Sequence, residues 1–335
     1  MRTIFSFLLA VSAFLAASTA ATAHPAHHRF PVTITDDLGT RVHLVKQPRR
    51  ILSLDPAHTE LLFALGLEKR LVGDGSKYDE GAEGFHMAFK YPSQWPSPWG
   101  RNYPVLAPRL THIEGGCCGT PWNIEAIDAL RPDLIVSLNS DLPSIAKMRS
   151  LGLKVLVLDP SNIAGILHDV TLLGRATGEE AHAAVVVANM RKDVSAVTKA
   201  IVKTRSRPRV YYEIDASDPT EPYLAGKGTF IDQVIHLAGG ANVADHAGLC
   251  SGKTCYPQVN LETLITLNPQ IIVLGDSAYG TSPSEVRSRS GWSTIAAVQH
   301  NRVYPFDDDL VSRDGPRIVI GLKAMAKLIH PGAFK

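Results

Sequence analysis

An internal repeat constrains the fold of this chain more than any other feature of its sequence. Residues 123–140 align without a gap on residues 260–277, at a constant offset of 137, and seven of the 18 positions are identical. In each copy an Asn precedes a short helical stretch with Glu in its first turn, a Pro ends that stretch, and an apolar strand follows. A repeat of this kind predicts two lobes with the same local construction.

Strands and helices alternate around both copies of the repeat. In the first half, the pattern predicts strands over 50–54 and 154–158 and a helix over 56–66. In the second half, it predicts a strand over 209–213 and a terminal helix over 316–329. This alternation is typical of the α/β class, so we expect two Rossmann-like lobes with mainly parallel sheets.

A long helix is predicted between the two halves. Residues 179–204 contain neither Pro nor Gly, and Gly178 and Pro208 flank them. About 26 residues at roughly 1.5 Å each give a helix near 39 Å long. An amphipathic surface helix would explain the composition, but a position midway between the repeats favours a rigid helix that joins the lobes.

The N-terminus is typical of a secretory signal. Arg2 precedes an apolar run of about 14 residues, and small residues follow up to Ala23. That run is shorter than the roughly 20 residues that cross a bilayer, so we expect cleavage after Ala23 rather than a membrane anchor. No cysteine follows the run, so no lipid attachment is expected, and the predicted location is the periplasm, which permits disulfides.

These features divide the 335 residues into five segments. We predict a signal peptide (1–23), an N-terminal tail with an entry strand (24–47), an N-terminal lobe (48–177), a connecting helix (178–206) and a C-terminal lobe (207–335).

Charge and motifs exclude several function classes. The chain has 34 basic and 32 acidic residues, which leaves no general attraction for nucleic acid. The segment 251–254 (Ser-Gly-Lys-Thr) imitates the end of a P-loop, but Gly248 lies one residue too close, and neither H-E-x-x-H nor G-x-S-x-G occurs. We therefore expect no catalysis and no cofactor, with a periplasmic enzyme or metallochaperone on the same scaffold as the alternative.

Several segments together resemble a known family. Residues 50–66 look like the opening strand and helix of the periplasmic binding proteins for iron–siderophores, haem and cobalamin, and residues 237–243 and 314–317 are similar to other positions of that family. The resemblance covers about residues 48–330. It implies two lobes joined by one long helix, a ligand cleft between them, and delivery of the ligand to an inner-membrane ABC permease by a monomer.

The resemblance also implies a role for the glutamates of the repeat. Glu125 and Glu262 occupy matched positions, where the family's glutamates contact arginines of the permease. A Glu in a first helical turn also stabilises its own helix by about 0.3–1 kcal/mol through the helix dipole. Two exposed carboxylates at equivalent tips of two lobes favour docking onto a two-fold permease.

Candidate ligand contacts lie on loops that follow strands. Parallel sheets bind ligands at the carboxyl ends of their strands, and planar aromatic side chains suit a large ring-shaped ligand. We therefore predict a metal chelate that carries Fe or Co, against the alternative of bare Zn, Mn or Fe ions held by His and carboxylates. Trp95 and Trp99 could instead pack their long loop onto the lobe. The predicted contacts are Tyr78, Trp95, Trp99, Trp122, Tyr223 and Tyr256, with Arg313 as a polar anchor.

Cysteines and histidines add weaker candidates. Cys250 and Cys255 are placed to form a local disulfide, whereas the state of Cys117 and Cys118 stays open, and a four-thiolate metal site matches no standard zinc spacing. His86 and His112 are candidate axial ligands of a haem or corrin metal, with ordinary surface positions as the alternative. The mature N-terminus would begin with a His-rich stretch, 24–28, which is either a tail or a weak metal ligand.

Overall fold

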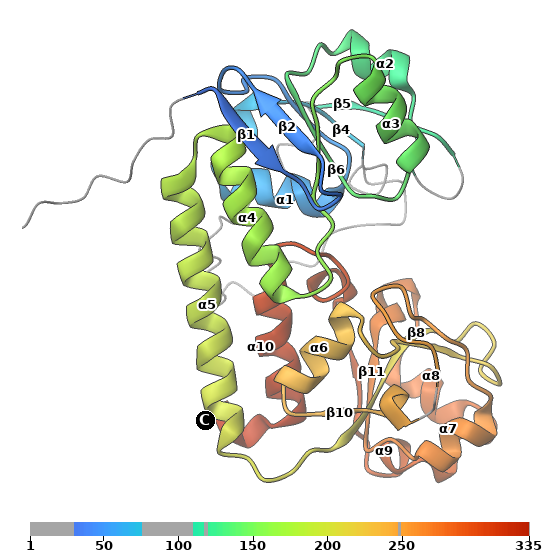
Figure 1. Cartoon of the computed structure of the whole chain (residues 1–335). Helices are drawn as coiled ribbons and strands as arrows, with labels where there is room; N and C mark the ends of the chain where they lie inside the picture. Colours follow the sequence, from blue (N-terminus) through green and yellow to red (C-terminus); the bar gives the residue numbers. More distant parts are fainter. Residues whose placement is uncertain (1–29, 76–109, 117–119, 247–248, 335) are drawn as a thin grey trace, which may run out of the picture.

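The computed structural model describes residues 30–75, 110–116, 120–246 and 249–334. The chain forms an upper and a lower lobe with a pair of long helices along one side (Figure 1). None of the helices in these ranges combines the length and the apolar character needed to cross a membrane.

The N-terminal lobe contains a five-stranded parallel sheet with the order β5-β4-β3-β6-β7. Its strands are β3 (Ile51–Ser53), β4 (Leu71–Asp74), β5 (Thr111–His112), β6 (Leu134–Ser137) and β7 (Val155–Val157). Its helices are α1 (Pro56–Ala64), η1 (Glu68–Arg70), α2 (Ile124–Ala129), α3 (Leu142–Ser150) and α4 (Ile163–Thr177).

The C-terminal lobe repeats this plan. Four parallel strands have the order β10-β8-β11-β12, and β9 pairs with β8 in the antiparallel sense. The strands are β8 (Arg209–Asp215), β9 (Tyr223–Leu224), β10 (Ala241–Asn242), β11 (Ile271–Leu274) and β12 (Val303–Pro305). The helices are α6 (Phe230–Leu237), η3 (Val243–His246), α7 (Leu261–Leu267), η4 (Gly275–Tyr279), α8 (Pro283–Ser288), η5 (Trp292–Thr294), α9 (Ala296–Gln299), η6 (Asp308–Leu310), α10 (Ile318–Ile329) and η7 (Pro331–Phe334).

The sequence repeat corresponds to a structural repeat. Strands β6 and β11 begin and end at residues that differ by 137. Before them, Arg131 and Asn268 both adopt left-handed backbone, with φ of 47° and 45°, and each precedes a proline. The short helices α2 and α7 are capped alike, because Asn123 accepts a hydrogen bond from Ala126 N and Asn260 accepts one from Thr263 N.

Two arginines, absent from our sequence-based expectations, extend this correspondence. Arg50 donates to the carbonyl oxygens of Leu130 and Arg131 at the end of α2. Arg209 donates in the same way to the carbonyls of Leu267 and Asn268 after α7. Each arginine therefore ties the start of a central strand to the C-terminal end of the repeat's helix, whose last carbonyls need partners.

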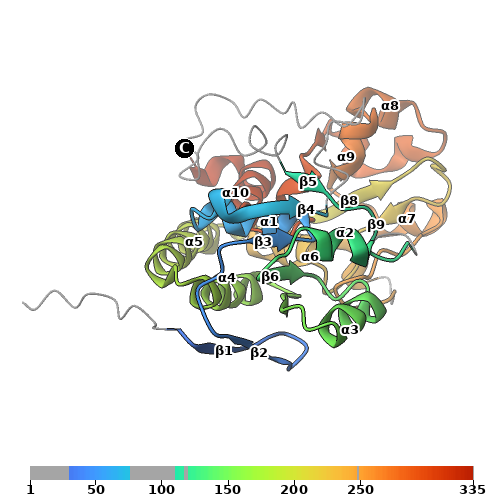
Figure 2. The same cartoon turned by 90° about the horizontal axis from the view of Figure 1, so that it is seen from above.

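Helix α5 (Glu180–Val202) lies between the two sheets in sequence and runs alongside both lobes (Figures 1 and 2). It has 23 residues, fewer than the predicted 26, and packs against α4 on one side and α10 and α6 on the other. The turn between α4 and α5 is fixed by Gly178, with φ of 71°, and by Arg70, which donates to Thr177 O and pairs with Glu179 at 2.6 Å.

One buried apolar cluster joins the lobes. It runs from the hairpin and sheet of the first lobe through α4 and α5 into α6, α10 and the sheet of the second lobe. Representative members are Ile51, Val170, Met190, Val210 and Leu322, each fully buried. The lobes therefore share a core rather than meeting through a surface contact.

Residues 30–47 form a hairpin where the sequence predicted a tail and an entry strand. They contain an antiparallel hairpin of β1 (Val32–Thr35) and β2 (Arg41–Leu44), whose alternating apolar residues are buried on one face. The buried carboxylate of Asp36 accepts hydrogen bonds from Val157 N and from Arg149, so the hairpin is fastened to the edge of the first sheet. The alternation in Val-Thr-Ile-Thr and the turn at Gly39, with φ of 74°, were the sequence signals for this element.

Candidate ligand-binding site between the lobes

The carboxyl ends of the two sheets contribute the polar contacts between the lobes. Glu60 on α1, which follows β3, pairs with Arg317 beside α10 and lies 4.0 Å from Arg313. Asp159, just after β7, pairs with Lys253 of the second lobe. Gln233 on α6 accepts a hydrogen bond of 2.8 Å from Ile163 N at the start of α4. Because ligands of such sheets bind at these strand ends, this region is the candidate site.

Carboxyl groups gather where the lobes meet. Burial and the nearby carboxylates of Asp55 and Asp159 raise the pKa of Asp314 to about 8. Burial also raises the pKa of Asp169, on α4, to about 8, with Asp37 and Asp314 adding to the effect. Both groups are therefore largely protonated near neutral pH, and a protonated carboxyl can donate a hydrogen bond.

His58 is a second buried polar group in the same region. Its ring is 1 % exposed, and neither ring nitrogen has a hydrogen-bond partner among the described residues. Burial lowers the pKa of His58 below its usual value, so the ring is neutral at neutral pH. His58, Asp169 and Asp314 were not among the predicted site residues, because only the fold brings these residues together.

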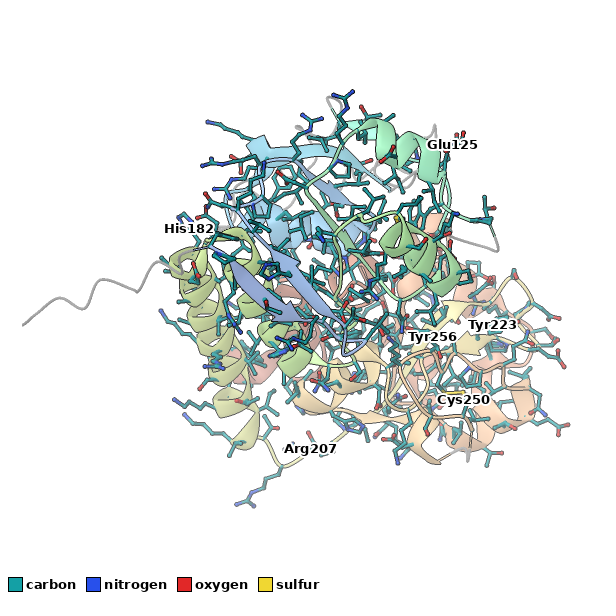
Figure 3. The ribbon with its side chains drawn as sticks, turned by 45° about the horizontal axis from the view of Figure 1, so that its top comes forward. Glu125, His182, Arg207, Tyr223, Cys250 and Tyr256 are labelled. Atoms are coloured by element: carbon teal, nitrogen blue, oxygen red, sulfur yellow. A yellow bond between two sulfur atoms is a disulfide. The ribbon has the colours of Figure 1, made fainter. Side chains whose placement is uncertain are left out.

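Tyr256 and Tyr223 are exposed on the second lobe (Figure 3), at 37 % and 40 % of their surface. Burial of the hydroxyl end, with the nearby charge of Asp308, raises the pKa of Tyr256 to about 12, so its hydroxyl stays protonated and can donate. Tyr223 lies on β9 and forms an isolated bridge with Gln258. Both residues thus present aromatic surface, as the sequence predicted for ligand contacts.

Trp122 corrects the expected set of exposed aromatic side chains. Its indole is 6 % exposed and belongs to an apolar cluster with Leu54, Ile113 and Ile127. The ring fills space that a Cβ atom on Gly75 or Gly116 would occupy, so these glycines let it pack inside the lobe. Trp122 is therefore packed in the core of the first lobe.

The remaining predicted contacts either have side-chain partners in the structure or fall outside the described residues. Arg313 donates to Asp309 of its own lobe at 3.1 Å and lies 4.0 Å from Glu60 of the first lobe. His112 lies on β5 with its Nδ1 3.2 Å from Asp74. Six candidate residues fall outside the described residues: Tyr78, His86, Trp95, Trp99, Cys117 and Cys118.

The predicted disulfide is present. Cys250 and Cys255 are bonded, with their Cα atoms 5.6 Å apart, and the bond closes the loop that carries Lys253 and precedes Tyr256. The loop between the cysteines therefore holds a group that contacts the first lobe.

The two repeat glutamates lie on the surface, as expected. Glu125 is exposed in the first turn of α2, and Glu262 is exposed in the first turn of α7 (Figure 3 labels Glu125). In Figure 1 both helices lie on the side of the molecule away from α5.

Comparison with known proteins identifies the family. Residues 51–310 match the family described as "Periplasmic binding protein". The chain belongs to the periplasmic binding protein family. Within this family, an uncharacterized ABC transporter substrate-binding lipoprotein of Bacillus subtilis is 30% identical over 314 residues, which cover 91% of this chain and 88% of that protein.

Two further members of the family have names that include a ligand. A cobalamin-binding protein of Halobacterium salinarum is 29% identical over 341 residues, covering 98% of this chain and 84% of that one. The crystal structure of a periplasmic vitamin B12 binding protein of Vibrio cholerae superimposes with a TM-score of 0.65 at 20% identity, covering 86% of this chain and 99% of that one. The latter comparison confirms the two-lobed periplasmic binding protein fold that the sequence predicted.

Proposed function

We propose that this periplasmic binding protein captures a metal-centred chelate of the corrinoid class and passes it to an ABC permease. The observation that carries the proposal is the match to a cobalamin-binding protein over 98% of the chain. Because that similarity spans both lobes, it includes every segment that faces the region between them.

The chemistry between the lobes supports a ligand without strong negative charge. Asp314, with a pKa of about 8, offers a protonated carboxyl group, and Tyr256 offers a hydroxyl with a pKa of about 12. Such donors suit neutral amide and carbonyl oxygens. Haem propionates or catecholates would lie beside Asp55 and Asp159, and like charges disfavour that arrangement. A corrinoid therefore fits better than haem or an iron–catecholate.

A binding protein for bare Zn, Mn or Fe ions is the alternative function. Such a site needs His and carboxylate groups that converge from both lobes. Within the described ranges, the one cluster of three such groups lies wholly in the second lobe. The match to the periplasmic binding protein family favours a binding role over a metallochaperone or enzyme, so the proposed role is binding without catalysis.

The metal enters with the ligand in this proposal. No resident cofactor is required, and the Fe or Co belongs to the chelate that is transported. Glu125 and Glu262 are proposed to contact basic residues of the permease, which a monomer can reach with both lobes at once.

Export places the protein where it can meet its ligand. We propose that the segment 1–23 directs secretion and is removed after Ala23, leaving the mature chain in the periplasm. Mass spectrometry of the protein recovered from its periplasm tests this step, since a mature mass that begins at His24 is expected and any other start contradicts the site.

The ligand class is tested by titrating the purified protein with cyanocobalamin, haemin, a ferric hydroxamate and ZnCl₂ under calorimetry. We expect saturable one-to-one binding of cyanocobalamin with a Kd below about 1 μM, corresponding to more than about 8 kcal/mol. Tighter binding of haemin or the hydroxamate would contradict the corrinoid assignment. Saturation by zinc with no binding of any chelate would contradict the wider proposal.

A further inference from the structure

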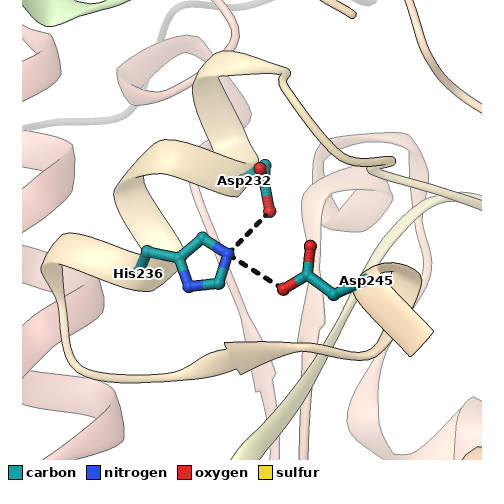
Figure 4. Close-up of side chains that lie close together, drawn as sticks. All are labelled: Asp232, His236 and Asp245. Carbon is teal, nitrogen blue, oxygen red and sulfur yellow. Dashed lines mark ion pairs between the residues drawn. The ribbon is translucent and has the colours of Figure 1, made fainter. Parts of the chain in front are cut away.

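Three metal-ligating side chains converge on the second lobe. Asp232 and His236 lie one turn apart on α6, and Asp245 lies on η3 (Figure 4). His236 Nε2 lies 3.2 Å from Asp232 Oδ1 and 3.0 Å from Asp245 Oδ2. All three ligand atoms lie within 4.8 Å of one another. The spacing i, i+4 on α6 places Asp232 and His236 on one face of the helix.

An ion pair alone does not account for this geometry. The Nε2 atom of an imidazole carries at most one proton, so it can direct a full hydrogen bond to one carboxylate at a time. Here two carboxylates approach the same nitrogen, which brings two negative charges together. A cation with open coordination positions would interact with all three atoms at once.

Buried groups outside the cluster hold Asp232 in place. Asn242, which is fully buried, donates to Asp232 Oδ1 at 2.9 Å, and Gly228 N donates to Asp232 Oδ2 at 2.8 Å. Asn242 is itself fixed because it donates to Ala225 O and accepts from Ala244 N. Hydrogen bonds of this kind orient the carboxylate before any ion arrives, as outer-shell partners do in metal sites.

We propose that Asp232, His236 and Asp245 form a binding site for a divalent transition-metal ion, with zinc as the best match. Zinc binds imidazole nitrogen and carboxylate oxygen at about 2.0–2.2 Å in tetrahedral geometry, which places neighbouring ligand atoms roughly 3.3–3.5 Å apart. The observed separations of 3.2 and 3.0 Å lie close to that range, so small movements would admit the ion. Three protein ligands leave a fourth position for water.

The ion would connect two elements of the second lobe. It would join α6, through Asp232 and His236, to η3, through Asp245. All three residues belong to the second lobe, and the site does not rest on the proposed transport function.

Protons compete with the metal at this site. The hydrogen bond to Asp232 is the main cause that raises the pKa of His236, partial burial opposes it, and the charges of Asp232 and Asp245 add to the rise. Zinc binds the neutral imidazole, so binding at this site displaces any proton that His236 holds.

The test compares zinc binding by the wild type with that of His236→Ala and Asp245→Asn, using untagged, chelator-treated protein and a chromophoric competitor. Both side chains are partly exposed, at 46% and 22%, so the variants should fold, which circular dichroism checks. We expect each variant to lose at least about tenfold in affinity for one zinc equivalent. Zinc should also raise the Tm of the wild type more than that of either variant.

His182→Ala provides the matched control. His182 is 65% exposed and has a single carboxylate partner, Glu179, at 2.8 Å, so its loss should leave the zinc affinity unchanged. The N-terminal histidines at 24, 27 and 28 are common to all variants and cancel in the comparison. Equal stoichiometry and affinity in the wild type, His236→Ala and Asp245→Asn would overturn the proposal.

Discussion

Glu60 on the first lobe and Arg317 on the second form an ion pair in which the carboxylate is 1% exposed. Arg313 lies 4.0 Å from the same carboxylate, so two cations of the second lobe face one buried anion of the first. The pair holds α1 against the start of α10, at the edge where the strands of both sheets end.

Removing this carboxylate should weaken the joined structure. Glu60→Gln leaves two arginines without their shared anion, and breaking a buried pair costs about 3–5 kcal/mol. We expect a loss of about 3 kcal/mol in the free energy of unfolding, measured by urea denaturation. Glu221→Gln, an exposed carboxylate, is the control and should change stability by less than about 0.5 kcal/mol.

The double variant Glu60→Leu with Arg317→Met sharpens this test. Replacing both members of a buried pair with apolar groups leaves no unpaired charge at either position, so part of the loss should be recovered. The single variants Glu60→Leu and Arg317→Met complete the comparison. If the double variant loses as much free energy of unfolding as the two single variants together, the two residues do not interact.

Asp169 should make stability depend on pH. Its carboxylate is 1% exposed, and neither oxygen has a hydrogen-bond partner among the described residues. Its pKa of about 8 in the folded chain lies above that of the unfolded chain, near 3.8, so the folded state binds more protons between these values. Stability therefore falls as the pH rises from about 4 to about 8.

The variant Asp169→Asn tests this dependence by thermal unfolding between pH 5 and 9. One pKa unit corresponds to about 1.4 kcal/mol, and we expect a gain of at least about 1 kcal/mol at pH 8, with less effect at pH 5. A loss of equal size at every pH would show that the carboxylate has a structural partner instead.

The two repeat glutamates should be needed for uptake but not for binding. Glu125→Ala with Glu262→Ala removes both exposed carboxylates, and we expect uptake by cells to fall to background while the Kd for the chelate is unchanged. The comparison variant is Asp128→Ala, an exposed carboxylate on the same helix as Glu125, which should transport normally. Normal uptake by the double variant would exclude these residues as the docking contacts.

Tyr256 should contact the ligand through its ring and its hydroxyl. Tyr256→Phe keeps the aromatic surface, whereas Tyr256→Ala removes it, so we expect a smaller loss of cyanocobalamin affinity for Phe than for Ala. A loss of about tenfold for Ala corresponds to about 1.4 kcal/mol. Equal affinities for wild type and Tyr256→Ala, measured by calorimetry, would place the ligand elsewhere.

The disulfide should stabilise the chain modestly. A bond between residues five apart closes a small loop, for which the chain-entropy relation gives about 2 kcal/mol. Cys250→Ser with Cys255→Ser should lower the Tm accordingly, and a reductant should lower the Tm of the wild type but not of this variant. An unchanged Tm in both experiments would contradict the prediction.

Local sequence signals were sufficient for much of the architecture. Caps such as Asn123 and Asn260, the proline after each short helix and the apolar strands gave the repeat, and the repeat gave two lobes of one class. The entry strand was expected, but its pairing in the hairpin β1–β2 was missed because the strands have only four residues each and Arg149, the partner of the buried Asp36, lies far away in the sequence.

The residues of the candidate site were harder to predict from the sequence than the fold. Trp122 has the residue type of a ligand contact, yet Gly75 and Gly116 approach it from other segments and leave room for it in the core. Asp169 and Asp314 lie on different lobes, 145 positions apart, and Asp314 raises the pKa of Asp169 only because the fold brings them close. Such properties depend on contacts between lobes, which no local pattern records.

The shared apolar core sets the mechanical character of the molecule. Separating the lobes would expose side chains of α4, α5 and α10 to water, so the free-energy cost grows as the gap widens. The two lobes should therefore return to their original spacing after a small displacement, rather than rotate freely about a hinge. In the proposed transport cycle, the energy needed to separate the lobes and release the ligand has to come from the permease and the nucleotide it hydrolyses.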